Sequence, residues 1–199
     1  MPFVLPDPEG LAPEVYPLAW LLGVWRGEGV VDYPGIDEAT FTQEVVFDHD
    51  GGPYLSYSST IRLVEVPPDP AALVDPDADV PDGAVWQTES GYWRVPPERP
   101  TDHGLTAEQH PVELLVADPS GHVGLFVGAV GKGRVDLVSD VIARAASGAD
   151  VSAEKRLYGL VNGELMWAHD IAAFGHPMQS YASGRLARVD AVEADEDAS

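Results

Sequence analysis

The side chains with which this chain could do acid–base or metal chemistry are 6 histidines and 33 acidic residues, and cysteine is absent. There is therefore no thiol nucleophile and no thiolate zinc site, and unclustered histidines do not indicate a metal centre. Two acid pairs could supply the carboxylates of a glycoside hydrolase: Asp136 with Asp140, and Glu89 with Asp170. With so many acids, such pairs arise by chance. A Gly-x-Ser-x-Gly elbow and a phosphate-binding loop are also absent, so the sequence does not favour a hydrolase.

The segment Gly23-Val24-Trp25-Arg26-Gly27-Glu28-Gly29 concentrates glycine around one tryptophan. As a strand, this segment places four residues on one face: Gly23, Trp25, Gly27 and Gly29. Glycine weakens a strand unless the backbone must bend sharply or another group must approach closely. We interpret the pattern as a strongly curved barrel strand whose buried indole plugs one end. Contact between a ligand and the glycine gap is the alternative.

Period-two alternation dominates the rest of the chain, with runs at 41–47, 54–63, 84–95, 112–117, 123–130, 134–142, 152–161, 164–174 and 178–189. Turn-forming residues stand near most of the breaks, and Asn162-Gly163 is the strongest hairpin signal. With residues 23–29, these runs predict an all-β fold, an antiparallel up-and-down β-barrel of about ten strands, because closure removes the exposed edges of a long sheet. An open β-sandwich is the alternative.

The predicted barrel occupies a single domain, residues 1–189. A short N-terminal helix is expected from Glu14 to Leu22, with Leu18, Leu21 and Leu22 as an apolar face that caps one barrel end. Residues 65–82 contain six acids and five prolines and are expected to form an acidic surface loop outside the barrel. Residues 190–199 contain five acids and are expected to be a disordered tail.

The net charge of −22, with only 11 lysines and arginines, excludes a protein that binds the phosphate backbone of nucleic acids. The same sign disfavours anionic membrane surfaces. We find no signal peptide and no run of roughly 18 apolar residues, so we expect a cytoplasmic protein. Nothing in the sequence specifies an oligomeric state.

Around its glycine motif the chain resembles the nitrobindin family. The segment from Leu18-Ala19-Trp20 through Gly29, followed by Tyr33-Pro34, is similar to the opening of that family, whose hallmark is Gly-x-Trp-x-Gly-x-Gly. Residues 89–94 and 166–189 are similar as well, so the resemblance covers roughly residues 14–189. It implies a ten-stranded barrel like that of fatty-acid-binding proteins, with a ferric b-type haem held near the mouth by one His on the last strand. It also implies nitric oxide binding and isomerisation of peroxynitrite to nitrate.

Two positions depart from the family's pattern. Tyr181 stands where the iron-binding His is expected, in the run Pro177-Met178-Gln179-Ser180-Tyr181. The family's Tyr-Pro-Thr, whose Thr approaches the haem, is here Tyr33-Pro34-Gly35. We therefore expect a nitrobindin-like barrel without haem-iron ligation, and we do not transfer the peroxynitrite isomerase activity to it.

Another residue could replace the missing ligand. A tyrosinate binds ferric haem, but the phenol of Tyr181 has an unperturbed pKa near 10 and needs a nearby cation to ionise. By strand parity, Arg185 lies on the same face as Tyr181, about 13 Å away. His176, at the presumed turn, is expected to be solvated. His169, on the preceding strand, is expected to be a strand histidine whose hydrogen bonds are satisfied, and an outward orientation is left open.

Three function hypotheses remain. The first is a barrel without haem chemistry and without enzymatic activity, which binds a small apolar ligand or none. The second is a ferric haem protein that uses a substitute axial ligand such as Tyr181. The third is an interaction domain whose acidic loop and tail recruit a basic partner.

Overall fold

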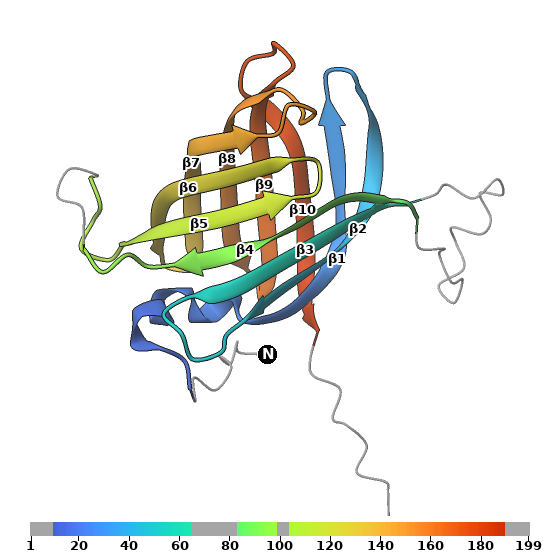
Figure 1. Ribbon diagram of the computed structural model, residues 1–199. Coiled ribbons are helices and arrows are strands. Elements are labelled where there is room, and N and C mark those ends of the chain that lie inside the picture. Colours follow the sequence, from blue (N-terminus) through green and yellow to red (C-terminus); the bar gives the residue numbers. More distant parts are fainter. Residues whose placement is uncertain (1–9, 65–82, 99–103, 190–199) are drawn as a thin grey trace, which may run out of the picture.

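Ten antiparallel strands close into a barrel in the computed structural model, which describes residues 10–64, 83–98 and 104–189 (Figure 1). The elements in chain order are η1 Pro13–Leu21, β1 Gly23–Tyr33, β2 Ile36–Asp48, β3 Leu55–Leu63, β4 Val85–Arg94, β5 His110–Asp118, β6 His122–Gly131, β7 Arg134–Arg144, β8 Val151–Val161, β9 Glu164–Ala173 and β10 Gln179–Val189. Consecutive strands pair, and β1 also pairs with β10. The predicted barrel is thus confirmed, and the open sandwich is excluded. The predicted acidic loop and tail lie outside the described residues.

Alternation of side chains builds the interior of the barrel. On β9, five alternate residues are buried: Leu165, Trp167, His169, Ile171 and Ala173. The β8–β9 hairpin turns at Asn162 and Gly163, whose φ angles are 54° and 88°. Positive φ at both central residues is what an Asn-Gly hairpin requires, so the strongest turn signal of the sequence is confirmed.

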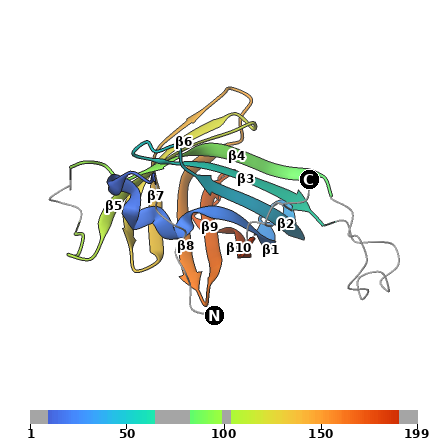
Figure 2. The same ribbon diagram turned by 90° about the horizontal axis from the view of Figure 1, so that it is seen from below.

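The end of the barrel where β1 begins is closed by η1 and Trp25. The predicted helix is present, as a 3-10 helix with prolines at Pro13 and Pro17, and it lies across this end of the barrel (Figure 2). Trp25 is fully buried, and its Nε1 donates a 2.7 Å hydrogen bond to the carbonyl of Leu21. The guanidinium of Arg188 stacks on the indole, 4.2 Å from the ring centre. The indole is therefore the plug that parity predicted.

The glycines of the motif let neighbouring strands approach β1. A Cβ on Gly27 would overlap the carbonyl oxygen of Arg185, and a Cβ on Gly29 would overlap both the carbonyl oxygen of Ser183 and the ring of Phe41. Both carbonyls belong to β10, the strand that closes the barrel against β1. These contacts support the interpretation of the motif as a closure device rather than a ligand contact.

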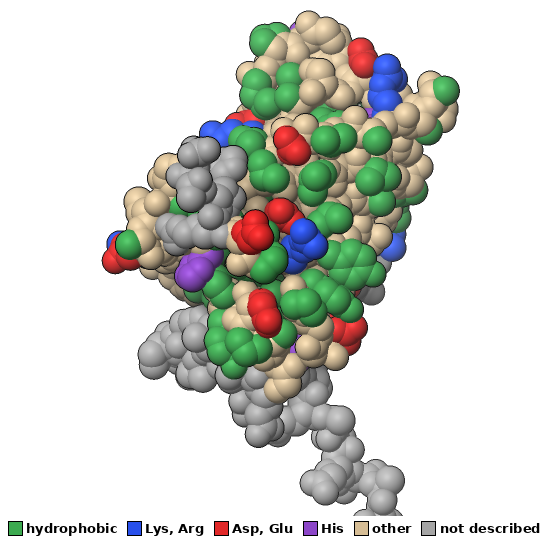
Figure 3. Space-filling view, turned by 60° about the vertical axis from the view of Figure 1, so that its left-hand side comes forward, with side chains coloured by type: hydrophobic (Ala, Val, Ile, Leu, Met, Phe, Trp, Pro, Cys, Tyr) green, Lys and Arg blue, Asp and Glu red, His purple; other side chains and the backbone are tan. Residues whose placement is uncertain are grey.

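The outer wall carries apolar and charged side chains together (Figure 3). Tyr92, Leu115 and Val141 on β4, β5 and β7 are each at least 40% exposed. Apolar side chains scattered over a surface are ordinary in a folded protein. Among the described residues, no helix combines the length and hydrophobicity needed to cross a bilayer.

Candidate functional site

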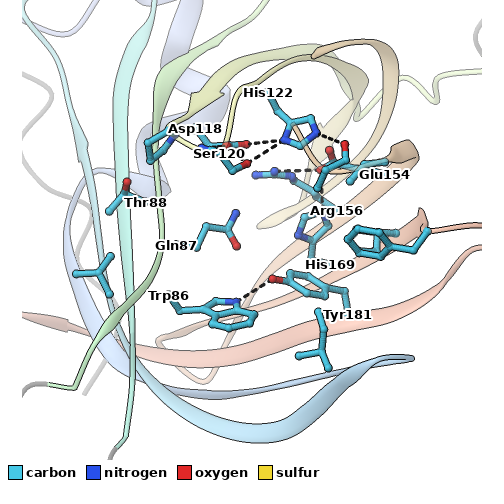
Figure 4. Close-up of a pocket in the computed structure, with 17 residues that line it drawn as sticks. Trp86, Gln87, Thr88, Asp118, Ser120, His122, Glu154, Arg156, His169 and Tyr181 are labelled. Carbon is cyan, nitrogen blue, oxygen red and sulfur yellow. Dashed lines mark hydrogen bonds and ion pairs between the residues drawn. The ribbon is translucent and has the colours of Figure 1, made fainter. Parts of the chain in front are cut away.

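A pocket of about 530 Å³ opens at the end of the barrel opposite Trp25. β10 connects the two ends, because it begins beside this pocket at Gln179 and pairs with Trp25 through Arg188 near its far end. One part of the pocket wall is apolar and includes Ile36, Val85, Val151, Ile171 and Phe174. The other part is polar and includes Gln87, Thr88, Asp118, Ser120, His122, Glu154, Arg156 and His169 (Figure 4). Trp86, Tyr181, Pro119 and Ala149 complete the lining.

Tyr181 points into this pocket from a β-bulge on β10. Ser180 pairs with Asp170 and Ala182 pairs with His169, so Tyr181 is an extra residue without a partner on β9. Its ring packs edge-on against His169, with ring centres 5.6 Å apart. A bulge re-aims a side chain and interrupts the alternation. The expectation that Arg185 shares the face of Tyr181 is therefore wrong.

Arg185 lies instead on the outer wall of the barrel. Its side chain is 64% exposed and forms an ion pair with Glu164. After the bulge, the residues of β10 that face inward are Ala182, Gly184 and Leu186, so Arg185 falls on the opposite face. The charge of Arg185 therefore does not lower the pKa of the Tyr181 phenol.

Trp86, which sequence reasoning did not single out, is the hydrogen-bond partner of Tyr181. Its Nε1 lies 2.9 Å from the phenol oxygen of Tyr181, across the pocket from β4 to β10 (Figure 4). Trp86 is also the extra residue of a bulge, because Ile61 pairs with Gln87 and Arg62 pairs with Val85. In the sequence, Ala84, Val85 and Trp86 are three consecutive apolar residues, which does not specify a bulge.

His169 is buried, with 8% of its surface exposed, and it faces the pocket. The outward orientation that the sequence left open is excluded, because His169 continues the buried row of Trp167 and Ile171. The expectation of a satisfied histidine is confirmed, since Nε2 lies 2.8 Å from a carboxylate oxygen of Glu154. This nitrogen is therefore already engaged.

Beneath His169, the buried guanidinium of Arg156 joins two carboxylates. It lies 2.6 Å from Glu89 and 3.2 Å from Glu154, and all three side chains are at most 11% exposed. Burial raises the pKa of Glu154, but the hydrogen bond from His169 and the charge of Arg156 outweigh it and hold this pKa at about 2, below the usual 4.5. Glu154 is thus ionised at neutral pH. The only sequence signal for this cluster is that Glu154 and Arg156 stand two residues apart on one strand face.

Of the two acid pairs considered for hydrolysis, Glu89 and Asp170 lie on opposite faces of the barrel wall, and Asp136 is engaged in an ion pair. Glu89 bonds Arg156 inside the barrel, whereas Asp170 follows the inward His169 and so lies on the other face of β9. On β7, Asp136 alternates with the buried Val135 and Leu137 and forms an ion pair with Arg134 on the outer wall.

The surroundings of Tyr181 keep its phenol protonated. Burial raises its pKa above 10.0, and the negative charges of Glu89, Glu154 and Asp118 raise it further. The hydrogen bond from Trp86 acts in the opposite direction but does not compensate.

The remaining candidates lie around the mouth. Gly35 occupies the β1–β2 turn with φ of 87°, and a Cβ there would meet no atom within 4 Å. His176, in the β9–β10 turn, is exposed as expected, and its ring centre lies 6.1 Å from that of Tyr33. His122 is buried; its Nδ1 lies 3.0 Å from Ser120 Oγ and its Nε2 lies 2.7 Å from the carbonyl of Ala149. Within the described residues, no three His, Asp or Glu side chains form a metal-binding group.

Comparison with known proteins shows which family this chain resembles. Residues 14–188 match the model of the THAP4-like, heme-binding beta-barrel domain. A "Ferric nitrobindin-like protein" of Beutenbergia cavernae is 48% identical over 95% of this chain and 100% of its own length. A "Peroxynitrite isomerase" of Clavibacter sepedonicus is 38% identical over 92% of this chain and 98% of its own. The crystal structure of Rv2717c from M. tuberculosis has a TM-score of 0.71 and 30% identity, covering 90% of this chain and 99% of that one.

Proposed function

Because the chain belongs to the nitrobindin family of haem-binding β-barrels, we propose that it retains the barrel without haem-iron ligation and without peroxynitrite isomerase activity. In place of haem b, its pocket binds a small apolar ligand. The size of the pocket and the apolar part of its wall suit such a ligand, since small-molecule sites of this kind are concave and mostly apolar with a few polar groups.

The main support for this proposal is that the phenol of Tyr181 is protonated and hydrogen-bonded. The resemblance assigns this position to the family's iron-binding His, and an imidazole binds ferric haem as a neutral donor. A phenol must first lose its proton, and here burial and three carboxylates raise its pKa. Its oxygen is also the acceptor for Trp86. The residues present therefore do not fit a haem whose iron is bound at position 181.

Three of the four ring nitrogens of the pocket histidines, His122 and His169, are already engaged. Nε2 of His169 is held by Glu154, and the two ring nitrogens of His122 are held by Ser120 and Ala149. Freeing any of these nitrogens for a metal would leave a buried polar partner without its hydrogen bond, which is unfavourable.

Titration of haemin into the purified protein tests the proposal. We expect the wild type to develop no saturable Soret shift at stoichiometric haemin and not to accelerate the decay of peroxynitrite. Tyr181→His should bind haemin more tightly than the wild type, because it restores a neutral nitrogen donor. Tyr181→Phe is the matched control and should behave like the wild type.

One observation favours a second function, a tyrosinate-ligated ferric haem protein. The indole N–H of Trp86 donates to the phenol oxygen, and such a bond stabilises a phenolate. A tight, stoichiometric wild-type complex with haemin that Tyr181→Phe abolishes would establish this function and refute the first.

A further inference from the structure

We propose that Trp86 is the residue that decides which ligands this pocket admits, because its indole blocks residue 181 against a metal centre. This inference rests on the proposed function and deepens it, since it assigns a cause to the exclusion of haem iron that is separate from the chemistry of the phenol. It also defines the accepted ligand as an apolar molecule without a metal.

Two bulges on different strands create the contact. Trp86 is the extra residue between the partners of Ile61 and Arg62, and Tyr181 is the extra residue between Ser180 and Ala182. Each bulge turns a side chain out of the regular alternation, as bulges next to functional sites do. Together they bring two rings that are 95 residues apart in sequence into hydrogen-bond contact at the pocket (Figure 4).

The contact competes directly with a metal. Nitrogen and oxygen ligands bind transition metals at about 2 Å. Nε1 of Trp86 already lies 2.9 Å from the phenol oxygen, so the indole stands on the pocket side of residue 181 where a metal would have to approach. A neutral imidazole has only one acceptor nitrogen. In a Tyr181→His variant, the lone pair that could bind iron is also the one that could accept the indole N–H.

The site around the indole suits a ligand of another kind. Trp86 is 38% exposed, and the apolar side chains of Ile36 and Phe174 line the same pocket. An apolar molecule can pack on these surfaces and leave the Trp86–Tyr181 bond intact. A metal-centred ligand bound through residue 181 has to displace the indole from the pocket side of that residue.

The test compares haemin with metal-free protoporphyrin IX, which has the same ring and the same carboxylates. Four proteins are titrated with both probes: the wild type, Tyr181→His, Trp86→Ala and the double variant Trp86→Ala/Tyr181→His. We expect the double variant to bind haemin about tenfold more tightly than Tyr181→His, the factor that one freed hydrogen-bond acceptor would give. We expect Tyr181→His to leave the affinity for protoporphyrin IX unchanged, whether Trp86 is present or replaced by Ala.

A matched control removes an exposed ring from the same strand. Tyr92 on β4 is 53% exposed and packs against Tyr54 on the outer wall, so Tyr92→Ala/Tyr181→His should bind haemin like Tyr181→His alone. Trp86→Met/Tyr181→His keeps much of the apolar volume without the N–H and should also gain haemin affinity. Circular dichroism and the urea midpoint show that each variant is folded.

Two outcomes overturn the inference. In one, Tyr181→His binds haemin as tightly as the double variant does, so Trp86 blocks nothing. In the other, Trp86→Ala raises the affinity for haemin and the affinity for protoporphyrin IX by the same factor, so the indole only fills space. Failure of the proposed function has a different signature, which is tight haemin binding by the wild type that Tyr181→Phe abolishes.

Discussion

The two ends of this barrel are built differently although both centre on a tryptophan. At the closed end, Trp25 is fully buried, its strand alternates regularly, and its N–H bonds the carbonyl of Leu21 in the preceding helix. At the mouth, Trp86 is 38% exposed, stands on a bulge, and donates its N–H to Tyr181. The indole at the closed end is part of the hydrophobic core, whereas the indole at the mouth is accessible to a ligand.

This difference indicates that the closed end determines folding stability and the mouth determines ligand specificity. The residues around Trp25 are buried and closely packed, so truncating a side chain there removes core contacts. Trp86 contacts the phenol of Tyr181 and shares its pocket with a histidine and buried charges, so a change there alters what the pocket accepts. Substitutions at the closed end should therefore cost folding free energy, and substitutions at the mouth should mainly change ligand binding.

The largest effect is expected for Trp25→Ala. Removing a fully buried indole should lower the free energy of unfolding by about 3 to 5 kcal/mol, measured by urea denaturation. The matched control is Trp86→Ala, which should cost markedly less because that indole is partly exposed. Equal midpoints for Trp25→Ala and the wild type would show that the closed end is not core.

Acid should weaken the charged cluster beneath the pocket. The pKa of Glu154 is about 2 in the folded state and 4.5 in the unfolded state, so the carboxylate stabilises the protein above pH 4.5. This contribution, about 3 kcal/mol, is lost as the pH falls through about 2. Urea denaturation between pH 5 and pH 2 should follow this loss, and Glu154→Gln should reduce the slope. An unchanged slope in that variant would remove Glu154 from the explanation.

Gly29→Ala should be less costly but still measurable. Its Cβ would overlap the carbonyl of Ser183 and the ring of Phe41, and forcing atoms into a packed interior costs roughly 1 to 3 kcal/mol. Gly159→Ala is the control, because a Cβ on Gly159 meets no atom within 4 Å. If the two variants have the same thermal midpoint, the motif glycines are not needed for closure.

The sequence predicted the regular parts of the molecule. Alternation located the strands, the Asn162-Gly163 dipeptide located a hairpin, and the resemblance indicated a closed barrel of ten strands. The burial of Trp25 followed from its parity with the motif glycines. These predictions succeeded because each depends on neighbours in the chain or on a period that nothing interrupts.

The mouth could not be predicted in the same way. A bulge inserts one residue without a compositional signal, so the inward turn of Trp86 and the outward position of Arg185 were missed. The position of Tyr181 at the mouth was indicated by the family resemblance and not by strand parity. The ion pair of Arg156 with Glu89 joins β8 to β4 across the barrel interior, and no local pattern specifies it. The inward position of His169 could have been predicted, because it shares the parity of Trp167 on the same strand.

The smallest effect on stability is expected for Tyr181→Phe. This variant keeps the ring that packs against His169 and removes only the oxygen that accepts from Trp86. Because Trp86 is partly exposed, water can take over its N–H, so the loss should stay within about 0.5 to 1.5 kcal/mol. Urea denaturation measures this loss, and the emission of Trp86 should change as its hydrogen-bond partner changes. Tyr92→Phe on the outer wall is the control and should alter neither quantity. If Tyr181→Phe instead destabilises the protein as much as Trp25→Ala does, the mouth is part of the structural core, and the distinction between the two ends fails.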